Sequence, residues 1–183
     1  VDNGVSAVNE AELIYKLGMK LVITDHHQLP DVLPRAEAIV NPHRSDDASP
    51  YKDYAGCGVV LKLIMALEGD ADGVLEQYSD IASIGTIGDV VPLTGENRII
   101  VKRGLSEIPY SENMGLIELI RAAGLNEESI TSTGVAFGIC PRINAAGRYK
   151  SPKAAAELFL AQNSKTAQLR AQELCELNDM RKK

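Results

Sequence analysis

The sequence contains no tryptophan, and only 4% of its 183 residues are aromatic. Leu, Ile, Val and Ala must therefore build most of the hydrophobic core, and the hydrophobic content of 45% is ample for that purpose. No apolar run approaches the roughly 18 residues of a membrane-spanning helix, so we expect no membrane association. No secretory signal peptide is visible either.

Cysteine is scarce as well. Cys57, Cys140 and Cys175 are far apart and odd in number, which predicts reduced thiols in a cytoplasm and not a disulfide framework. The sequence has no CxxC pair, and this absence argues against a structural zinc site.

The chain has fewer basic than acidic residues, and the basic residues are unevenly distributed along it. The formal net charge is −6, yet residues 1–141 hold 10 Lys and Arg against 21 Asp and Glu, whereas residues 142–183 hold 9 against 4. An acidic body suits a cation site, and a basic end suits phosphate groups. An ordinary solvated helix surface would give the same asymmetry, so composition alone leaves both interpretations open.

The stretch 22–27 (VITDHH) stands out because an apolar run stops at an acid and two histidines. Val22 and Ile23 are typical of a buried strand, and ligands of open parallel sheets bind beyond the carboxyl ends of strands. Neighbouring side chains in extended backbone point to opposite sides, so His26 and His27 are expected to act differently. One imidazole would bind a metal and the other a substrate oxygen. The alternative is a polar strand end, with Asp25 as a cap and two exposed histidines.

The beginning of the chain predicts a βαβ unit. Residues 1–4 resemble the tail of a strand, residues 7–15 have helical periodicity with Ser6 as a possible cap, and Gly18 ends that helix. The strand at 21–24 would then lie parallel to the first strand. Asp2 would therefore lie beside residues 25–27 at one edge of the sheet.

The rest of the chain is mostly helical by pattern. A strand is expected at 38–40, helices at 56–67, 78–87, 97–108, 114–123 and 131–138, and two further helices beginning near Ser151 and Ser164. Asp70 and Asp72 follow a helix end at Gly69 and are interpreted as a turn. These elements predict an α/β fold, in which a parallel sheet flanked by helices is followed by a helical C-terminal segment.

The segment 141–148 (PRINAAGR) combines two arginines with an asparagine around small residues. We interpret it as a turn in which Arg142, Asn144 and Arg148 could hold a phosphate, because guanidinium groups bind phosphate oxygens bidentately.

These motifs together resemble the DHH phosphoesterase superfamily, and in particular RecJ-type single-strand-specific exonucleases. The resemblance rests on four motifs whose order and spacing match across nearly the whole chain. The motifs are 1–4 (VDNG), 24–27 (TDHH), 83–93 (SIGTIGDVVPL) and 141–148, supported by 41–42 (NP) and 55–59 (AGCGV).

The resemblance implies a two-metal hydrolase, with Mn²⁺ or Mg²⁺, that removes nucleotides from the 5′ end of single-stranded DNA in recombination and repair. By position it makes Asp2 the carboxylate that bridges the metals, with His26 and Asp89 as further ligands. Carboxylate and imidazole ligands suit Mn²⁺. Single-strand-binding protein and a helicase are further possible partners.

The same resemblance assigns the remaining site residues. His27 would face the scissile phosphate, and Asp25 would orient the site from behind the ligands. Arg148, together with Arg142 and Asn144, would bind substrate phosphate.

The chain also departs from the family pattern. An acid pair (Asp-x-Asp) would precede the motif of Asp2, and a second domain would follow Lys183; Asp70 and Asp72 only mimic the acid pair. We therefore expect residues 1–150 to be a partial DHH catalytic domain and residues 151–183 a helical segment leading toward an absent domain. Such a chain should fold but not cut DNA by itself.

Two other functions remain open. One is a DHH phosphodiesterase acting on short oligonucleotides or small nucleotides, against which the segment 141–148 argues. The other is a non-catalytic replication scaffold with a DHH fold, which would be expected to have lost ligands that this chain keeps.

Overall fold

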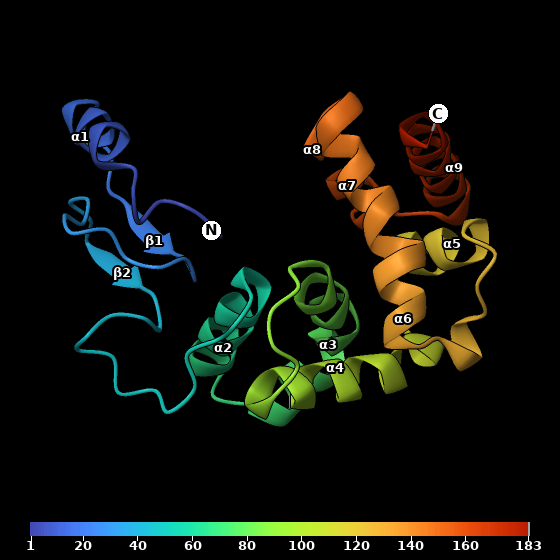
Figure 1. Cartoon of the computed structure of the whole chain (residues 1–183), viewed down its shortest axis with the longest axis horizontal. Coiled ribbons are helices and arrows are strands. Elements are labelled where there is room, and N and C mark those ends of the chain that lie inside the picture. Colours follow the sequence, from blue (N-terminus) through green and yellow to red (C-terminus); the bar gives the residue numbers. More distant parts are fainter. Residues whose placement is uncertain (183) are drawn as a thin grey trace.

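Two short parallel strands and a series of helices make up the computed structural model, which describes residues 1–182 (Figure 1). Strands β1 (Val22–Thr24) and β2 (Ala38–Val40) pair with Ile23 opposite Ile39. In chain order the helices are α1 (Val8–Lys16), α2 (Gly56–Glu68), α3 (Ala71–Gly88), α4 (Gly95–Glu107), α5 (Met114–Ala122), α6 (Ser132–Gly134), α7 (Cys140–Tyr149), α8 (Pro152–Phe159) and α9 (Ser164–Arg181). Short 3₁₀ turns lie at Ile108–Tyr110 (η1) and Glu127–Ser129 (η2), and a π-helical turn (η3) spans Val135–Ile139.

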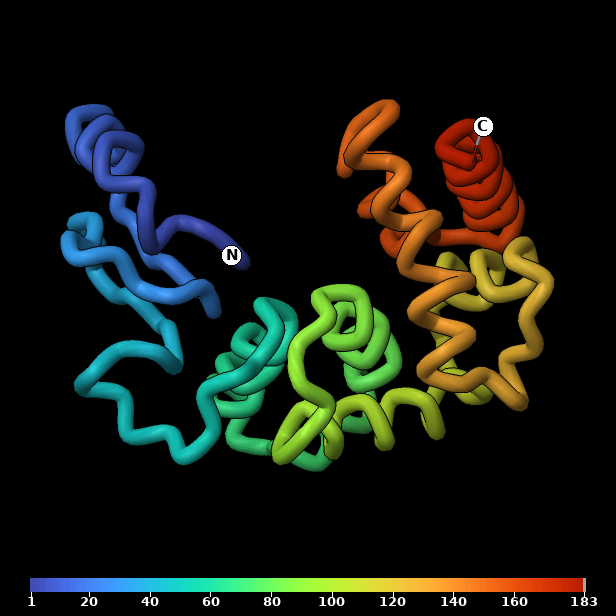
Figure 2. Tube along the Cα trace, in the orientation of Figure 1, coloured from blue at the N-terminus to red at the C-terminus, as the bar shows by residue number. Residues whose placement is uncertain are grey.

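The elements form two arms joined by a base (Figures 1 and 2). Helix α1 and the two strands form one arm, α2, α3 and α4 form the base, and α7, α8 and α9 form the other arm. The N-terminal segment runs toward the space between the arms, so residues at the start of the chain lie above the base.

The predicted first strand is wrong for the described residues, although the predicted position of Asp2 is right. Asp2 and Gly4 have φ values of +60° and +121°, and a strand does not continue through such conformations. The parallel pair is therefore β1 with β2, and not residues 1–4 with β1. The Asp2 N–H still donates to the Thr24 carbonyl at 2.7 Å, which places Asp2 beside the end of β1.

Side-chain caps decide where several helices begin. Asp70 caps α3 by accepting from the Gly73 N–H at 3.0 Å, so that helix starts at Ala71 and the predicted turn is wrong. Ser151 caps α8 with Pro152 at its first position, as predicted. The predicted cap at Ser6 is wrong, because α1 begins at Val8 without a side-chain cap.

The segment 141–148 is helical and not the predicted turn. The π-helical turn Val135–Ile139 leads directly into α7, whose Ala145 and Ala146 are fully buried. Alanine is the best helix former, and here it also lets α7 pack closely against its neighbours. Any phosphate-binding side chain in this segment therefore projects from a face of helix α7.

Two cores hold the base and the C-terminal arm together. The first lies among α2, α3 and α4 and the second among the C-terminal helices, and both are built largely from Leu, Ile, Val and Ala, as composition predicts. Helix α3 contributes Ala82 to the first core and Ile84 to the second. It also packs tightly on α4, since a Cβ on Gly104 would lie 2.0 Å from the Ser79 carbonyl oxygen. Helix α3 is thereby fixed along its length, and its C-terminal end carries Asp89.

Within residues 1–182, no helix is both long enough and apolar enough to cross a membrane.

Candidate metal centre

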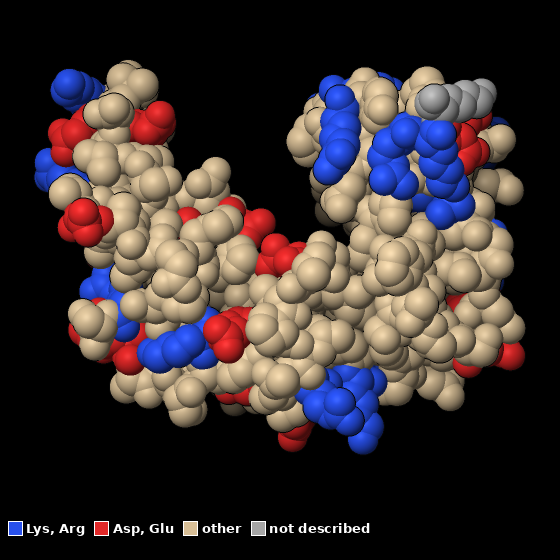
Figure 3. Space-filling view, viewed as in Figure 1, with Lys and Arg blue, Asp and Glu red and all other residues tan. Residues whose placement is uncertain are grey.

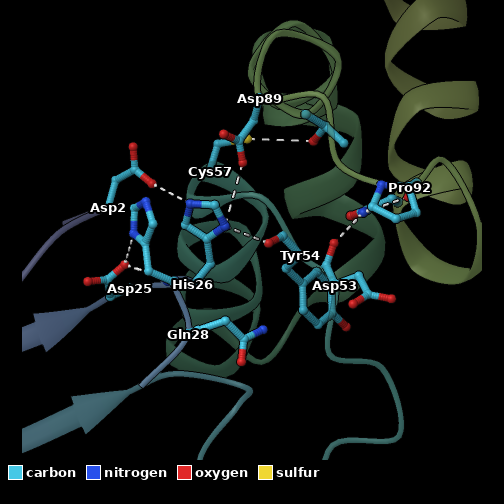
Figure 4. A network of polar contacts seen from close by, with 12 residues as sticks. Asp2, Asp25, His26, Gln28, Asp53, Tyr54, Cys57, Asp89 and Pro92 are labelled. Carbon is cyan, nitrogen blue, oxygen red and sulfur yellow. Dashed lines mark hydrogen bonds and ion pairs between the residues drawn. The ribbon is translucent and has the colours of Figure 1, made fainter. Parts of the chain in front are cut away.

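His26 is the centre of the site that forms beyond β1. Its side chain is only 12% exposed, and its Nδ1 lies 3.0 Å from the Tyr54 carbonyl oxygen (Figure 4). A carbonyl oxygen can only accept, so this contact makes Nδ1 the protonated nitrogen. Nε2 then keeps its lone pair, which is the arrangement that fixes a metal-binding histidine in protein sites.

Two carboxylates from distant segments meet at this imidazole. Asp2 Oδ1 lies 3.2 Å from His26 Nε2, and Asp89 Oδ2 lies 3.5 Å from His26 Nδ1. Figure 4 shows the two carboxylates reaching different nitrogens of the His26 ring, Asp2 from the N-terminal segment and Asp89 from the end of α3. Both side chains are partly exposed, so they remain open to a ligand.

Glycine at position 56 makes room for Asp2. A Cβ on Gly56 would lie 1.8 Å from Asp2 Oδ1, and no side chain fits at that distance. Gly56 is the first residue of α2, and the positive end of a helix dipole favours a nearby carboxylate. Gly56 thus faces a carboxylate of the chain itself, whereas Gly58 packs against the Tyr54 ring.

Asp25 serves as an internal acceptor. Its buried carboxylate accepts from the N–H groups of Val5, His26 and His27, and Oδ1 lies 2.7 Å from His27 Nδ1. Burial alone would raise the pKa of Asp25, but the Val5 N–H, the His27 ring and the two further N–H groups lower the pKa to about 2. Asp25 is therefore an anion at neutral pH, and its hydrogen bonds fix the conformation of this loop.

His27 points outward beside His26, with the two ring centroids 4.5 Å apart. The hydrogen bond to Asp25 raises the pKa of His27, and the charges of Asp25, Asp2 and Asp89 raise it further, against a lowering by burial. Nδ1 is held by Asp25, so Nε2 is free to face a bound molecule. The two histidines thus have different partners, as predicted for adjacent residues after a strand.

The donor set fits a divalent cation of the Mn²⁺ or Mg²⁺ type. Asp2 and Asp89 offer carboxylate oxygens and His26 offers one imidazole nitrogen, a combination that suits Mn²⁺. Among the described residues, the group whose potential ligand atoms lie within 4.8 Å of one another is Asp25, His26 and His27, whereas the Asp2 and Asp89 carboxylates approach different nitrogens of His26. Asp25 is the weaker ligand of these groups, because its Oδ1 already accepts from both backbone N–H groups and faces the His27 ring.

A cleft of about 350 Å³ joins the carboxylates to the C-terminal arm. Its lining includes Asp2, Gly56, Cys57, Asp89 and Asn144. Figure 3 shows acidic side chains on the floor of the hollow between the arms and basic side chains on the arm of the C-terminal helices. Asn144 therefore lies in the same cleft as two of the predicted metal ligands.

The three predicted phosphate-binding residues are not equivalent in the structure. Asn144 and Arg148 are both exposed and lie four residues apart in α7, so they share one face of the helix. Arg142 lies on another face, where it donates to the Gly138 carbonyl at 2.6 Å and to Cys175 Sγ at 3.2 Å. The structure thus brings Asn144 and Arg148 together and gives Arg142 partners within the protein.

Sequence reasoning missed two features of this site. The Tyr54 carbonyl has no signal in the sequence, because any residue supplies a backbone oxygen. The close approach of Asp2 to Gly56 had a partial signal in the glycine pair before an apolar helix, but nothing indicated its partner.

Residues 1–86 match the family model described as DHH family, N-terminal domain. The whole chain is 39% identical over 183 residues to the single-stranded-DNA-specific exonuclease RecJ of Bacillus subtilis and covers 23% of that protein. A crystal structure of exonuclease RecJ bound to manganese is similar with a TM-score of 0.87 and 37% identity, over 100% of this chain and 46% of that one. A structure of RecJ in complex with Mn²⁺ from Thermus thermophilus has a TM-score of 0.86 and 36% identity, over 100% of this chain and 27% of the other. The chain thus spans well under two thirds of the proteins it resembles.

Proposed function

Because residues 1–86 match the DHH family and the whole chain is similar to RecJ exonucleases, we propose that it forms part of the catalytic region of a metal-dependent 5′-to-3′ exonuclease on single-stranded DNA. The observation that carries this proposal is the placement of His26 between the carboxylates of Asp2 and Asp89. These three residues would hold Mn²⁺ or Mg²⁺, with Asp2 as the bridging carboxylate of a two-ion site. A pair of such ions, when bound, activates water and stabilises the oxygens of an in-line phosphoryl displacement.

His27 acts on the substrate side of this site, and Asp25 positions it from behind. Asp25 fixes the His27 ring through Nδ1, so Nε2 is directed to the scissile phosphate. The raised pKa of His27 favours its protonated form, which donates to a phosphate oxygen. Asp25 itself makes no contact with substrate in this proposal and is a positioning residue.

Arg148 and Asn144 bind substrate phosphate from the facing arm. Their shared face of α7 and the presence of Asn144 in the cleft support this role. Arg142 keeps its predicted role as a phosphate-binding residue in this proposal, although its contacts with Gly138 and Cys175 restrain it. A phosphate would compete with those contacts for its guanidinium group.

The wider assignments also follow from the similarity. We assign residues 1–150 to a partial DHH catalytic domain and 151–183 to a helical segment. We expect single-strand-binding protein and a helicase as partners in repair and recombination. Cytoplasmic residence is supported by the free thiols of Cys57, Cys140 and Cys175 among the described residues.

A nuclease assay tests the proposal. A polypeptide of the length of the RecJ relatives that contains this chain should shorten 5′-labelled single-stranded DNA with Mn²⁺ and spare duplex DNA, and a His26→Ala variant should lose this activity. The 183-residue chain by itself should not cut, because three protein ligands do not fill two coordination shells. Preference for short oligonucleotides over long strands would instead favour an oligonucleotide phosphodiesterase, and a metal-binding but inactive longer protein would favour a scaffold.

A further inference from the structure

The aromatic side chain of Phe137 lies on the surface and not in a hydrophobic core. It is 81% exposed, although the chain has only two phenylalanines and no tryptophan. It lies in the π-helical turn Val135–Ile139, a feature that occurs frequently at functional sites. Resting on the proposed function, we propose that Phe137 is a stacking platform for a base of the single strand that leads away from the metal centre.

A groove connects Phe137 to the metal centre. The groove has a volume of about 330 Å³, and its lining includes Val90, Phe137, Asn144, Arg148 and Arg181. It shares Gly88, Cys140 and Asn144 with the cleft that contains Asp2 and Asp89. A strand with one phosphate at the metal centre can therefore continue past Asn144 into the groove without leaving the surface.

The charges in the groove suit a phosphate backbone. Within residues 1–182, neither Arg148 nor Arg181 forms an ion pair, whereas the other arginines include four that are paired with carboxylates: Arg44, Arg103, Arg121 and Arg170. Two guanidinium groups without carboxylate partners beside an exposed ring form the combination that binds single strands, a positive track with an aromatic platform.

Arg181 is held toward this groove by a buried residue. Its Nη2 donates to Asn178 Oδ1 at 3.2 Å, and Asn178 is fully buried in α9. The groove thus contains a positioned cation at the end of α9 and another, Arg148, on α7. Val90 adds an apolar contact, since it is 87% exposed and lines the groove.

The absence of tryptophan makes a direct test possible. Phe137→Trp would carry the sole tryptophan of the chain, so any fluorescence change reports on that position. Tyr110→Trp is the matched control, because Tyr110 is also 81% exposed but lies in η1 beside acidic residues. Both 183-residue variants are titrated in EDTA with oligothymidylate and with an abasic oligomer of equal length.

We expect oligothymidylate to quench Phe137→Trp and the abasic oligomer to leave its fluorescence unchanged, while Tyr110→Trp responds to neither. If anisotropy of a labelled oligonucleotide shows binding but Phe137→Trp is not quenched, the inference is overturned and the proposed function stands. If the wild-type chain does not bind the oligonucleotide, the inference is overturned as well, and the Mn²⁺ titration still tests the metal centre separately.

A second variant separates stacking from charge. Phe137→Ala should weaken binding of oligothymidylate roughly tenfold and leave the salt dependence of the affinity unchanged. Arg148→Ala should weaken binding and reduce the salt slope by about one phosphate contact. Unchanged affinity in Phe137→Ala would overturn the inference and indicate a protein-contact role for this ring.

Discussion

The carboxylate of Asp2 lies directly against the backbone of Gly56, where a Cβ atom would be 1.8 Å from Oδ1. The backbone N–H of Asp2 also donates a hydrogen bond to the Thr24 carbonyl. Asp2 therefore links the end of β1 to the first residue of α2. The first residue of α2 thereby positions a proposed metal ligand without being one.

Gly56→Ala should therefore displace Asp2 and weaken Mn²⁺ binding by roughly 10- to 100-fold, as loss of a supporting contact does at metal sites. Gly134→Ala is the control, since its added Cβ would meet its nearest neighbour at an ordinary 3.5 Å. Calorimetric Mn²⁺ titration of both variants checks this. Equal affinities in the two variants would show that Asp2 does not need its present position.

His26 and His27 should differ in what they bind. His26→Ala removes a proposed ligand and should abolish most Mn²⁺ binding, whereas His27→Ala should leave Mn²⁺ affinity nearly intact and depress turnover of the longer polypeptide. The reason is that His27 Nδ1 is bound to Asp25, while His26 lies between the two carboxylates. An equal loss of Mn²⁺ affinity in both variants would contradict this division of roles.

Asp70 should contribute to the stability of the fold and not to Mn²⁺ binding. Asp70→Ala removes the cap of α3 and should lower the free energy of unfolding by about 1 kcal/mol, whereas Asp72→Ala should have little effect. Urea unfolding monitored by circular dichroism measures the difference. Mn²⁺ affinity should be unchanged in both variants, and a loss of affinity in either would mean that these acids belong to the metal site.

Asp25 should make the free energy of unfolding depend on pH in the acid range. Its pKa in the folded chain is about 2, below the ordinary value of 3.8, so its contribution of about 2 kcal/mol is present above pH 4 and lost as the pH falls through 2. Asp25→Asn should flatten that part of the profile. Unfolding measured from pH 6 to pH 2 tests this, and parallel profiles for the two chains would contradict it.

The sequence allowed the site to be predicted better than the sheet. Thr24, Asp25 and the two histidines lie at the end of a strand, and Asp2 lies beside them, because strand ends gather polar residues whatever the strand order. The first predicted strand failed, because Asp2 and Gly4 adopt positive φ values that residue types alone do not reveal.

In the C-terminal part of the chain, the local structure around the predicted phosphate-binding residues was not predicted correctly. Arg142, Asn144 and Arg148 were grouped as one phosphate site on the assumption of a turn, but in a helix the four-residue spacing puts Asn144 and Arg148 on one face, whereas Arg142, two residues before Asn144, lies on another. Helix α7 forms because Ala145 and Ala146 are buried against distant segments, which is information that the local sequence lacks.

The most direct test of the metal centre is electron paramagnetic resonance of Mn²⁺ with the 183-residue chain, because the sharp signal of free Mn²⁺ falls as the ion binds. Wild type and Asp72→Ala should bind Mn²⁺ alike, and Asp2→Ala, His26→Ala and Asp89→Ala should each weaken binding at least about tenfold. Equal Mn²⁺ binding by all five chains would contradict the assignment of Asp2, His26 and Asp89 as the metal ligands.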